Sequence, residues 1–590
     1  MSFEFWYTLV LLVIMSYLLM KDWFDTALIV FGTLILLLIG KVITIDEAFS
    51  GFSNVGMLTI GILFIIAGAI YNTGAISQVH NIIFGNSHNT VRRMFRILFP
   101  VSLISAFMNN TPVVAMLTPV VRSWTEKQNL SLSKFLIPLS YAAILGGMCT
   151  LIGTSTNLVV HGLLIDHGLP GLGLFEISKV GIPLAIIGLL YIITIGYKLL
   201  PDRQEPLVRL GKDTREFVIE LKVKENYPHI GATIENAGLR HLTGLFLFQI
   251  ERGGRIIAPA GPNEKILEGD RLFFTGIPKT ILELQKTPGL QLIKDQSFDL
   301  KQYDSSEIKT YEAAISPSSP LIGNNVRESN FREKYGAVII AIHRNGERIN
   351  KKIGDIVLFP GDTLLLLADK NFRKKWYHSN DFYLISDTEA IPSKPKWQMF
   401  ISVGVLLLIV LLTLFKIMPL ISAAALGALI LIISRCITPQ EASRSIDFKV
   451  LIIIASALGI ANAMENSGLA EFISSNILTM ASNFGAIGVI TGIYIVTSLY
   501  TLIITNNAAA AFLFPVGFMA AVSLGVDVKP FAITIMIAAA ASFATPISYQ
   551  TNLMVYGPGG YKFRDFIKVG LPLQIVVGVC AILLIYYFYF

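Results

Sequence analysis

Two pairs of polar motifs lie inside otherwise apolar segments of this 590-residue chain, and their side chains could bind a small ion. The first pair is Asn109-Asn110-Thr111 and Thr505-Asn506-Asn507. The second pair is Gly153-Thr154-Ser155-Thr156-Asn157 and Ser548-Tyr549-Gln550-Thr551-Asn552. Amides and hydroxyls in an apolar setting are costly unless they are paired. A lone Asn would favour a simple interhelical hydrogen bond, but matched motifs in both halves of the chain favour a binding site.

The segments around these motifs hold no Asp, Glu, Lys or Arg over residues 101–121, 135–165, 484–526 and 530–561. Proton pumps and antiporters usually carry an intramembrane carboxylate, so this absence argues against proton coupling. Amide, hydroxyl and carbonyl oxygens instead suit a hard cation such as sodium. Where a helix is interrupted, its free N–H groups can hold an anion. At two such breaks we expect four side chains to bind a small anion, namely Thr156, Asn157, Thr551 and Asn552.

The elements that position these motifs are predicted to be membrane helices. With 53% hydrophobic and 15% charged residues, the composition is far from the average of soluble domains. Apolar runs that can cross ~30 Å of hydrocarbon recur near both ends of the chain and are missing from its middle. In the first block we expect crossings at about residues 5–20, 26–41, 55–76, 135–165 and 177–200. A further apolar stretch in each block is too interrupted to be a simple span.

Sequence matches between the two apolar blocks indicate an internal duplication. Residues 43–48 (ITIDEA) recur as 437–442 (ITPQEA), and residues 179–184 (KVGIPL) recur as 568–573 (KVGLPL). Ordered matches along a whole block argue against coincidence. An odd number of crossings in each block inverts the second copy, and inverted repeats are a transporter architecture with the binding site at their interface.

The distribution of Lys and Arg predicts the orientation in the membrane. If the middle segment is cytoplasmic, most basic loop residues fall inside: Arg92, Arg93, Arg96, Arg122, Lys127, Lys134, Arg435, Arg444, Lys449, Lys562, Arg564 and Lys568. This places both termini outside a cytoplasmic (inner) membrane. The net charge of +7 is then explained by these topogenic residues, and no nucleic-acid partner is expected.

The middle of the chain has the composition of a soluble insert made of two similar modules. Ile230-Gly231 and Gly269-Asp270 recur as Ile322-Gly323 and Gly361-Asp362, and Gly244 recurs as Gly336. Each Gly-Asp turn is followed by a predicted strand. These turns, together with Arg344-Asn345-Gly346-Glu347, resemble the carboxy-terminal domains of TrkA-type potassium-uptake regulators. The resemblance implies regulation by the insert, a homodimer and a small cytosolic ligand.

The predicted fold is therefore an α-helical polytopic membrane protein. It is an inverted repeat of two blocks, each with about five transmembrane helices and one re-entrant hairpin, plus a soluble α+β insert of two tandem modules. The domains are residues 1–201 (first transmembrane repeat), 202–300 and 301–395 (the two TrkA-C-like modules) and 396–590 (second transmembrane repeat).

The paired motifs make the membrane blocks similar to the divalent anion:sodium symporter family. Its Ser-Asn-Thr signatures lie at the tips of two re-entrant hairpins that face two broken helices. The resemblance implies substrate contacts from Asn110, Thr111, Asn506 and Asn507. It implies one sodium site from Ser105, Asn109, Asn110 and Gly153, and another from Thr501, Thr505, Asn506 and Ser548.

Three departures from the family pattern bear on the expected site. Asn109 replaces the first Ser, Asn507 replaces the last Thr, and the paired prolines of the breaks are absent. The additional amide N–H donors shift the expected anion from a dicarboxylate toward sulfate. The expected function is sodium-coupled symport of a small divalent anion across the bilayer, with sodium as the co-transported ion.

Other functions remain open at this point. The same fold could serve a sodium/proton antiporter or a metalloid-anion exporter, and the missing carboxylates argue against the antiporter. A ligand-gated channel would need a filter-like repeat around a pore axis. An enzyme is not expected, since no nucleophile and base are paired in the sequence.

Overall fold

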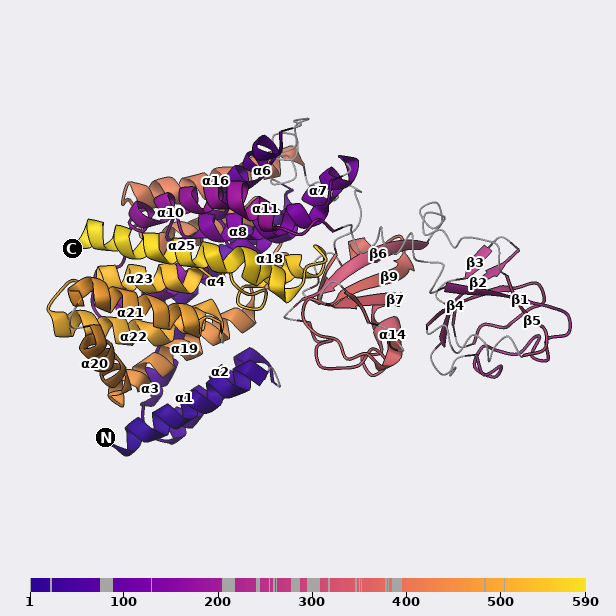
Figure 1. The fold of residues 1–590 in the computed structure, drawn as a ribbon, viewed down its shortest axis with the longest axis horizontal. Coiled ribbons are helices and arrows are strands. Elements are labelled where there is room, and N and C mark those ends of the chain that lie inside the picture. Colours follow the sequence, from indigo (N-terminus) through magenta and orange to yellow (C-terminus); the bar gives the residue numbers. More distant parts are fainter. Residues whose placement is uncertain are drawn as a thin grey trace.

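The structure is a computed structural model with a helical body and two small β-sheets beyond one end of it (Figure 1). It describes residues 2–590 except 22–23, 75–88, 129, 204–217, 240–244, 254, 258–259, 262, 277–286, 294–307, 317–318, 345–346, 350, 352, 377–378, 380, 385–394, 482–483 and 503. Both chain termini lie at the side of the helical body that is away from the sheets (Figure 1).

Most helices of the two helical blocks follow one another in a corresponding order. The first has α1 (Phe3–Lys21), α2 (Thr26–Ile39), α3 (Ile45–Phe49), α4 (Val55–Asn72), α6 (Thr90–Ser105), α7 (Asn110–Lys127), α8 (Leu136–Gly147), α9 (Ser155–Asp166), α10 (Ser178–Tyr191) and α11 (Tyr197–Leu199). The second has α16 (Lys396–Leu414), α17 (Leu420–Ile433), α18 (Pro439–Ser445), α19 (Phe448–Asn466), α20 (Leu469–Ala481), α21 (Gly485–Tyr500), α22 (Asn506–Leu524), α23 (Lys529–Ala540), α24 (Gln550–Tyr556) and α25 (Phe563–Tyr589).

The matching sequences of the two blocks form matching local structures. Thr44 begins α3 with a capping box in which its side chain and Glu47 each accept a backbone N–H of the other residue. Thr438 and Glu441 form the same capping box at the start of α18. The repeated ITIDEA and ITPQEA segments therefore begin equivalent short helices because their Thr and Glu residues have the capping-box spacing.

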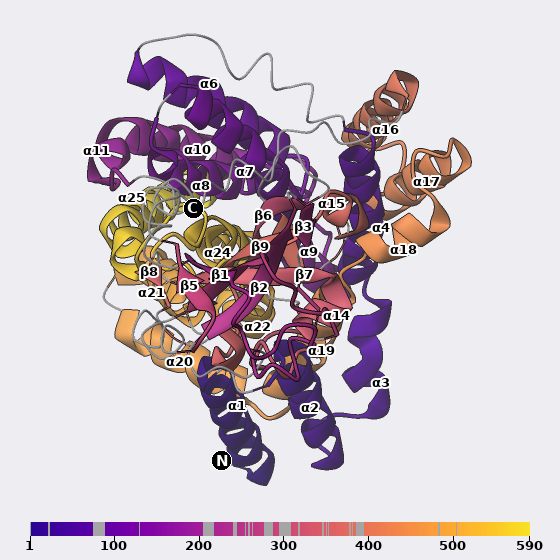
Figure 2. The same cartoon turned by 90° about the vertical axis from the view of Figure 1, so that its right-hand side faces the viewer.

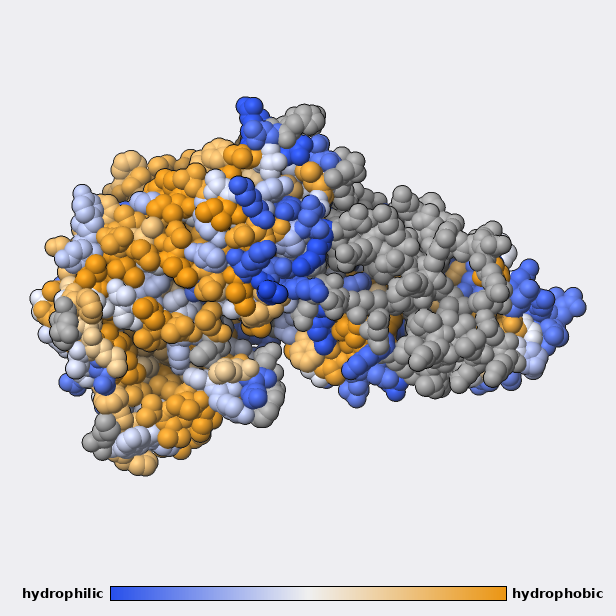
Figure 3. Space-filling view, in the orientation of Figure 1, coloured by the Kyte–Doolittle hydropathy of each residue, from blue (hydrophilic) through white to orange (hydrophobic). Residues whose placement is uncertain are grey.

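The helical body has the composition and surface of a multi-pass membrane protein. Among the described residues, seven helices are long and apolar enough to cross a membrane, and they include α1, α16, α19, α22 and α25. Large apolar side chains remain exposed on the body, such as Trp6 (54%) and Ile433 (72%). Hydrophobic residues cover most of its visible face, and hydrophilic residues gather next to the sheets (Figure 3).

Two of the predicted crossings are not formed by a single long helix. Helix α2 has 14 residues, fewer than the roughly 20 that span a bilayer. Its run ends at Gly40, and Lys41 adopts a positive φ of 60° at the turn that follows. The predicted crossing at 135–165 is formed by α8 and α9 with an irregular segment between them, so the expected break is confirmed.

The insert forms two five-stranded antiparallel sheets with the same strand order. The first runs β3-β2-β4-β1-β5 and the second β10-β6-β9-β7-β8, which is the same order when β1–β5 are matched with β6–β10. The strands are β1 (Val218–Val223), β2 (Leu245–Arg252), β3 (Arg255–Ile257), β4 (Arg271–Gly276), β5 (Leu290–Leu292), β6 (Ile308–Ile315), β7 (Ala337–Arg344), β8 (Glu347–Arg348), β9 (Thr363–Asp369) and β10 (Phe382–Leu384). The second sheet also carries the short helices α14 (Phe331–Tyr335) and α15 (Phe372–Trp376).

Each module has its own cluster of buried hydrophobic residues, and both clusters are separate from the core of the helical body. In the first, Arg252 forms a two-pronged ion pair with Asp270, at 2.8 and 2.9 Å. In the second, Arg344 binds Asp362 in the same way, at 2.7 Å in both bonds. The predicted motif residues Gly244, Asn345 and Gly346, and the predicted module boundary at 300, lie outside the described residues.

Candidate functional site

The first pair of motifs lies at two helix starts. Helix α6 ends at Ser105 and α7 begins at Asn110, while α21 ends at Tyr500 and α22 begins at Asn506. The first N–H groups of a helix have no partner within it, and they carry partial positive charge. Each motif therefore combines amide side chains with a helix N-terminus.

The second pair of motifs lies at two interrupted helices. Helix α8 ends at Gly147 before α9 begins, and α23 ends at Ala540 before α24 begins. Asn157 Nδ2 donates to the carbonyls of Gly147 (3.3 Å) and Thr150 (2.9 Å). These bonds satisfy carbonyl groups that the interrupted helix leaves without a partner.

Asn552 makes the equivalent bonds in the second break. Its Nδ2 donates to the carbonyls of Ser542 (2.9 Å) and Thr545 (3.1 Å), the same sequence positions relative to the amide. Asn157 and Asn552 are both fully buried. Their amide nitrogens thus hold the two breaks in shape, and their expected contact with an anion stays a prediction.

A chain of hydrogen bonds joins the start of α7 to both breaks. Ser105 Oγ donates to Asn110 Oδ1 at 2.6 Å, and Asn110 Nδ2 donates to the Tyr549 hydroxyl at 2.6 Å. The same hydroxyl lies 3.1 Å from Thr154 Oγ1. All four side chains are buried. Residues from three separate stretches of the chain therefore converge on one phenol oxygen.

Other bonds bring the remaining motif residues to the same region. Asn507 Oδ1 accepts from Ser155 Oγ (3.0 Å) and from Thr156 Oγ1 (3.1 Å). Thr111 Oγ1 donates to Gln550 Oε1 at 3.1 Å. The start of α7 is thereby linked to that of α24 and the start of α9 to that of α22, and the contact of Thr154 with Tyr549 joins the two pairs. The partial positive charge of these helix starts is concentrated where the surrounding segments contribute no ionic side chain.

Thr551 is fully buried. Ser140 Oγ donates to Asn552 Oδ1 at 2.7 Å and lies 2.9 Å from Thr551 Oγ1. The two residues are therefore tied to α8, a helix of the opposite block.

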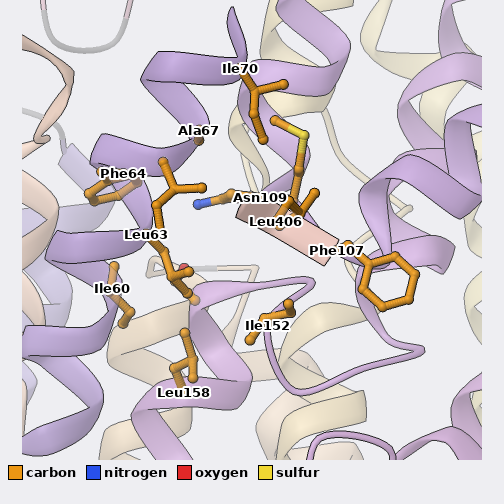
Figure 4. Close-up of a pocket in the computed structure, with 13 residues that line it drawn as sticks. Ile60, Leu63, Phe64, Ala67, Ile70, Phe107, Asn109, Ile152, Leu158 and Leu406 are labelled. Atoms are coloured by element: carbon orange, nitrogen blue, oxygen red, sulfur yellow. The ribbon is translucent and has the colours of Figure 1, made fainter. Parts of the chain in front are cut away.

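The residues expected at the first sodium site are partly assembled. A Cβ at Gly153 would lie 2.7 Å from the Gly147 carbonyl oxygen and 3.0 Å from that of Ala106, so only glycine fits between these two backbones. Ser105 and Asn110 are bonded to each other beside this contact. Asn109 instead points toward α4 and lines a pocket of about 30 Å³ (Figure 4).

That pocket is lined mainly by apolar residues. Its walls come from α4, from residues 107–109 between α6 and α7, from the first break with the start of α9, and from Leu406 of α16. Asn109 and Ser155 are the polar residues among those that line it. Such a lining does not suit an anion.

Two of the side chains expected at the second sodium site donate hydrogen bonds to nearby backbone carbonyls. Thr501 Oγ1 donates to the Ser498 carbonyl (2.7 Å), and Ser548 Oγ donates to the Thr545 carbonyl (3.2 Å). Thr505 is exposed and its side chain does not cap α22. Asn506 is 9% exposed, and its Oδ1 has no hydrogen-bond partner among the described residues. This buried amide oxygen is available to a ligand.

Sequence reasoning assigned no role to Tyr549, Thr154, Ser155, Gln550 or Ser140. Four of them lie within the two break motifs, so their position was known but their direction was not. A phenol inside an apolar span next to a break was a signal, because a buried Tyr hydroxyl usually finds a partner.

The second sheet contacts two of the helices that begin at this site. Arg122 of α7 and Glu312 of β6 form an ion pair at 2.8 Å, and their side chains are 7% and 3% exposed. A Cβ at Gly557, directly after α24, would lie 2.2 Å from Thr363 Oγ1 and 2.7 Å from the Gly361 carbonyl oxygen. The helix that starts at Asn110 and the half-helix that carries Thr551 and Asn552 therefore touch the same module.

Comparison with known proteins shows similarity to one transporter family and to several individual proteins. Residues 10–538 match the model of the citrate transporter family CitMHS. A protein of Chlamydomonas reinhardtii, provisionally named a sulfur deprivation response regulator, is 37% identical over 95% of this chain and 97% of its own length. An uncharacterized transporter of a Synechocystis species is 30% identical over 99% and 97%. Sodium/sulfate cotransporter 1 of Chlamydomonas reinhardtii is 26% identical over 92% and 85%.

Proposed function

The chain belongs to the citrate transporter family, and from that premise we propose that it is a secondary transporter that couples sodium to the movement of a small divalent anion. Sulfate is the favoured anion and a dicarboxylate the next. The observation that carries the proposal is the meeting of four helix starts with amides and hydroxyls in segments that lack Asp, Glu, Lys and Arg. Helix N-termini attract anions without the strong desolvation cost of a buried ion pair.

The preference for sulfate rests on two considerations. Several relatives are named sodium/sulfate cotransporters, among them the Chlamydomonas protein that aligns with 92% of this chain. Asn110, Thr111 and Asn507 bring amide and hydroxyl groups to one hydrogen-bonded cluster, which suits a tetrahedral oxyanion. Substrate contacts are proposed for Asn110, Thr111, Asn506, Asn507, Thr156, Asn157, Thr551 and Asn552.

Sodium is proposed to bind beside the two hairpin tips. Ser105, Asn109, Asn110 and Gly153 would form one site, and Thr501, Thr505, Asn506 and Ser548 the other. Hydroxyl, amide and carbonyl oxygens are the ligands that hard cations take. The unpartnered Asn506 Oδ1 supports the second site, and the approach of Gly153 to the Ala106 carbonyl supports the first.

The architecture is proposed to be an inverted repeat with alternating access. The corresponding order of most helices in the two blocks and the equivalent amide bonds of Asn157 and Asn552 support the repeat. We place the insert in the cytoplasm and both termini outside the inner membrane, which agrees with the separation of the termini from the sheets (Figure 1).

The insert is proposed to be a regulator made of two modules, residues 202–300 and 301–395, between transmembrane repeats 1–201 and 396–590. The shared strand order and the matched Arg–Asp pairs support a duplication. Its resemblance to TrkA-type carboxy-terminal domains supports a homodimer and a small cytosolic ligand.

Uptake into proteoliposomes tests the function. Labelled sulfate, succinate, citrate and phosphate are supplied separately, with an inward sodium gradient or with choline in place of sodium, at several pH values. We expect sulfate uptake that requires sodium and changes little with pH, because the site has no carboxylate to titrate. Equal uptake with choline would refute sodium coupling, and uptake of none of the anions would refute the function.

A further inference from the structure

The two break motifs differ at the residue that precedes each half-helix. Thr154 precedes α9 and Tyr549 precedes α24, and both are buried. Neither side chain caps its own helix. The second break therefore inserts a phenol ring at a position where the first break has a small hydroxyl side chain.

The chemistry of the partners of Tyr549 decides which atom donates and which accepts in each of its hydrogen bonds. An amide nitrogen can only donate, so the Tyr549 oxygen accepts from Asn110 Nδ2. Asn110 is itself fixed, because its Oδ1 accepts from Ser105 Oγ. The single phenol proton is then left to donate, either to Thr154 Oγ1 or to a ligand oxygen between the helix starts.

We propose that Tyr549 is a specificity-determining residue of the anion site. Its hydroxyl donates to an oxygen of the anion, and its ring shortens the site so that a compact tetrahedral oxyanion fits better than an extended dicarboxylate. This inference rests on the proposed function and adds a residue and a physical basis for the selection of sulfate. A site built around a polar donor discriminates strongly when that donor is removed.

Two substitutions separate the donor from the size of the ring. Tyr549→Phe keeps the ring and removes the hydroxyl, and it should raise the KM for sulfate about fivefold or more without admitting succinate. Tyr549→Thr copies the first break and should raise the ratio of succinate to sulfate uptake about tenfold. Tyr494→Phe is the matched control, since the Tyr494 hydroxyl is buried and has no hydrogen-bond partner among the described residues.

The outcomes distinguish this inference from the function on which it rests. Sodium-dependent sulfate uptake by the natural protein supports the function, and its absence overturns both. If Tyr549→Phe keeps the natural KM, or if Tyr549→Thr keeps the natural substrate ratio at normal membrane abundance, Tyr549 does not select the anion. Because a ratio of two substrates is compared within one variant, a general loss of folded protein does not imitate the expected result.

A second, independent observation concerns how the insert is attached. In the first module, Arg271 pairs with Glu220 and with Glu251, and its hydrogen bond to Glu220 is the main cause that raises the pKa of Arg271. Matching strand for strand, Thr363 stands in the second module where Arg271 stands in the first, and Glu312 stands where Glu220 stands. The Glu312 carboxylate pairs with Arg122 of α7, outside its own module.

We infer that the second module is the docked half of the insert and that Arg122–Glu312 is its coupling contact to the transport site. A buried ion pair that loses one partner leaves an uncompensated charge, so the contact is disrupted strongly when either side chain changes. The close approach of Gly557 to Gly361 joins α24 to the same module. The first module has no such contact at its equivalent turn, because a Cβ at Gly269 would meet no described atom within 4 Å.

Charge exchange tests the contact in the full-length protein. Glu312→Gln should make the second module more sensitive to limited proteolysis, and it should lower the maximal sulfate uptake rate about fivefold with an unchanged KM. The double variant Arg122→Glu with Glu312→Arg should restore both properties. Arg327→Gln is the control, because the Arg327–Asp355 pair of the same module is exposed, at 65% and 57%, and such pairs contribute little.

Proteolysis reports on docking even if no anion is transported, so it is independent of the proposed function. Unchanged proteolysis of the Glu312→Gln protein would show that the pair does not hold the module. Failure of the exchanged pair to restore the natural pattern would equally overturn the inference.

Discussion

Asn110 and Asn506 occupy matching positions at the starts of α7 and α22, yet they differ in their partners. Both ends of the Asn110 amide are bonded, one to Ser105 and the other to Tyr549. Asn506 keeps a buried Oδ1 without a partner among the described residues. The first amide therefore organises neighbouring hydroxyls, whereas the second offers an oxygen to a ligand.

Substitution of either amide should abolish transport. Asn110→Ala takes the partner from the buried Ser105 hydroxyl and one of two partners from the Tyr549 hydroxyl, at a cost of about 1–3 kcal/mol, and Asn506→Ala removes a ligand oxygen. Sulfate uptake measures the effect, and size-exclusion chromatography checks that the variants remain folded. Asn476→Ala serves as control, because Asn476 is exposed and bonds only within α20. Normal uptake by either site variant would make that motif structural.

At the scale of elements, the two breaks are stabilised by the same device. A break leaves carbonyl groups bare in an apolar environment, and each is satisfied by an amide from the half-helix that follows. The amide in turn fixes where the half-helix begins. This explains why Asn recurs at the same place in both motifs.

Loss of one amide should destabilise its break. We expect Asn157→Ala and Asn552→Ala each to lower stability by about 1–3 kcal/mol, since two buried carbonyls lose their donor. A decrease in the Tm of the detergent-solubilised protein measures this, with Asn476→Ala for comparison. A Tm equal to that of the natural protein would mean that the amide is not needed to hold the break.

The molecule as a whole has a helical body with a largely apolar surface and an insert of two sheets at one end of it (Figures 1 and 3). Turned by 90°, the sheets lie in front of the helical body (Figure 2). The second sheet is the one that contacts α7 and the end of α24. If the insert regulates transport as proposed, a signal from the first module would reach the site through the second.

Cysteine labelling in intact cells tests the proposed orientation. In a background without Cys149, Cys436 and Cys580, a cysteine at exposed Ser523, near the end of α22, should react with an impermeant maleimide. A cysteine at exposed Glu225 of the first module should react only after the cells are opened. The reverse pattern would place the insert outside.

Removal of the insert tests whether it is a regulator. Residues 213–375 are replaced by a flexible linker that spans the same ends, in an Arg122→Gln background so that no buried guanidinium is left unpaired. We expect sodium-coupled uptake to persist with an altered rate, because the site residues all belong to the helical body. A folded deletion variant that binds sulfate without turnover would make the insert part of the transport machinery.

The sequence by itself determined the membrane character, the two breaks and the matched polar motifs. These features depend on composition and short spacing, so local chemistry decides them: apolar runs form helices, and Thr-x-x-Glu begins one. Only the tertiary structure decided which side chains meet. Asn110 and Tyr549 are 439 residues apart, and Arg122 and Glu312 are 190 apart. Such contacts depend on how the two blocks and the insert pack together, and no local pattern encodes the direction in which a buried phenol or carboxylate points.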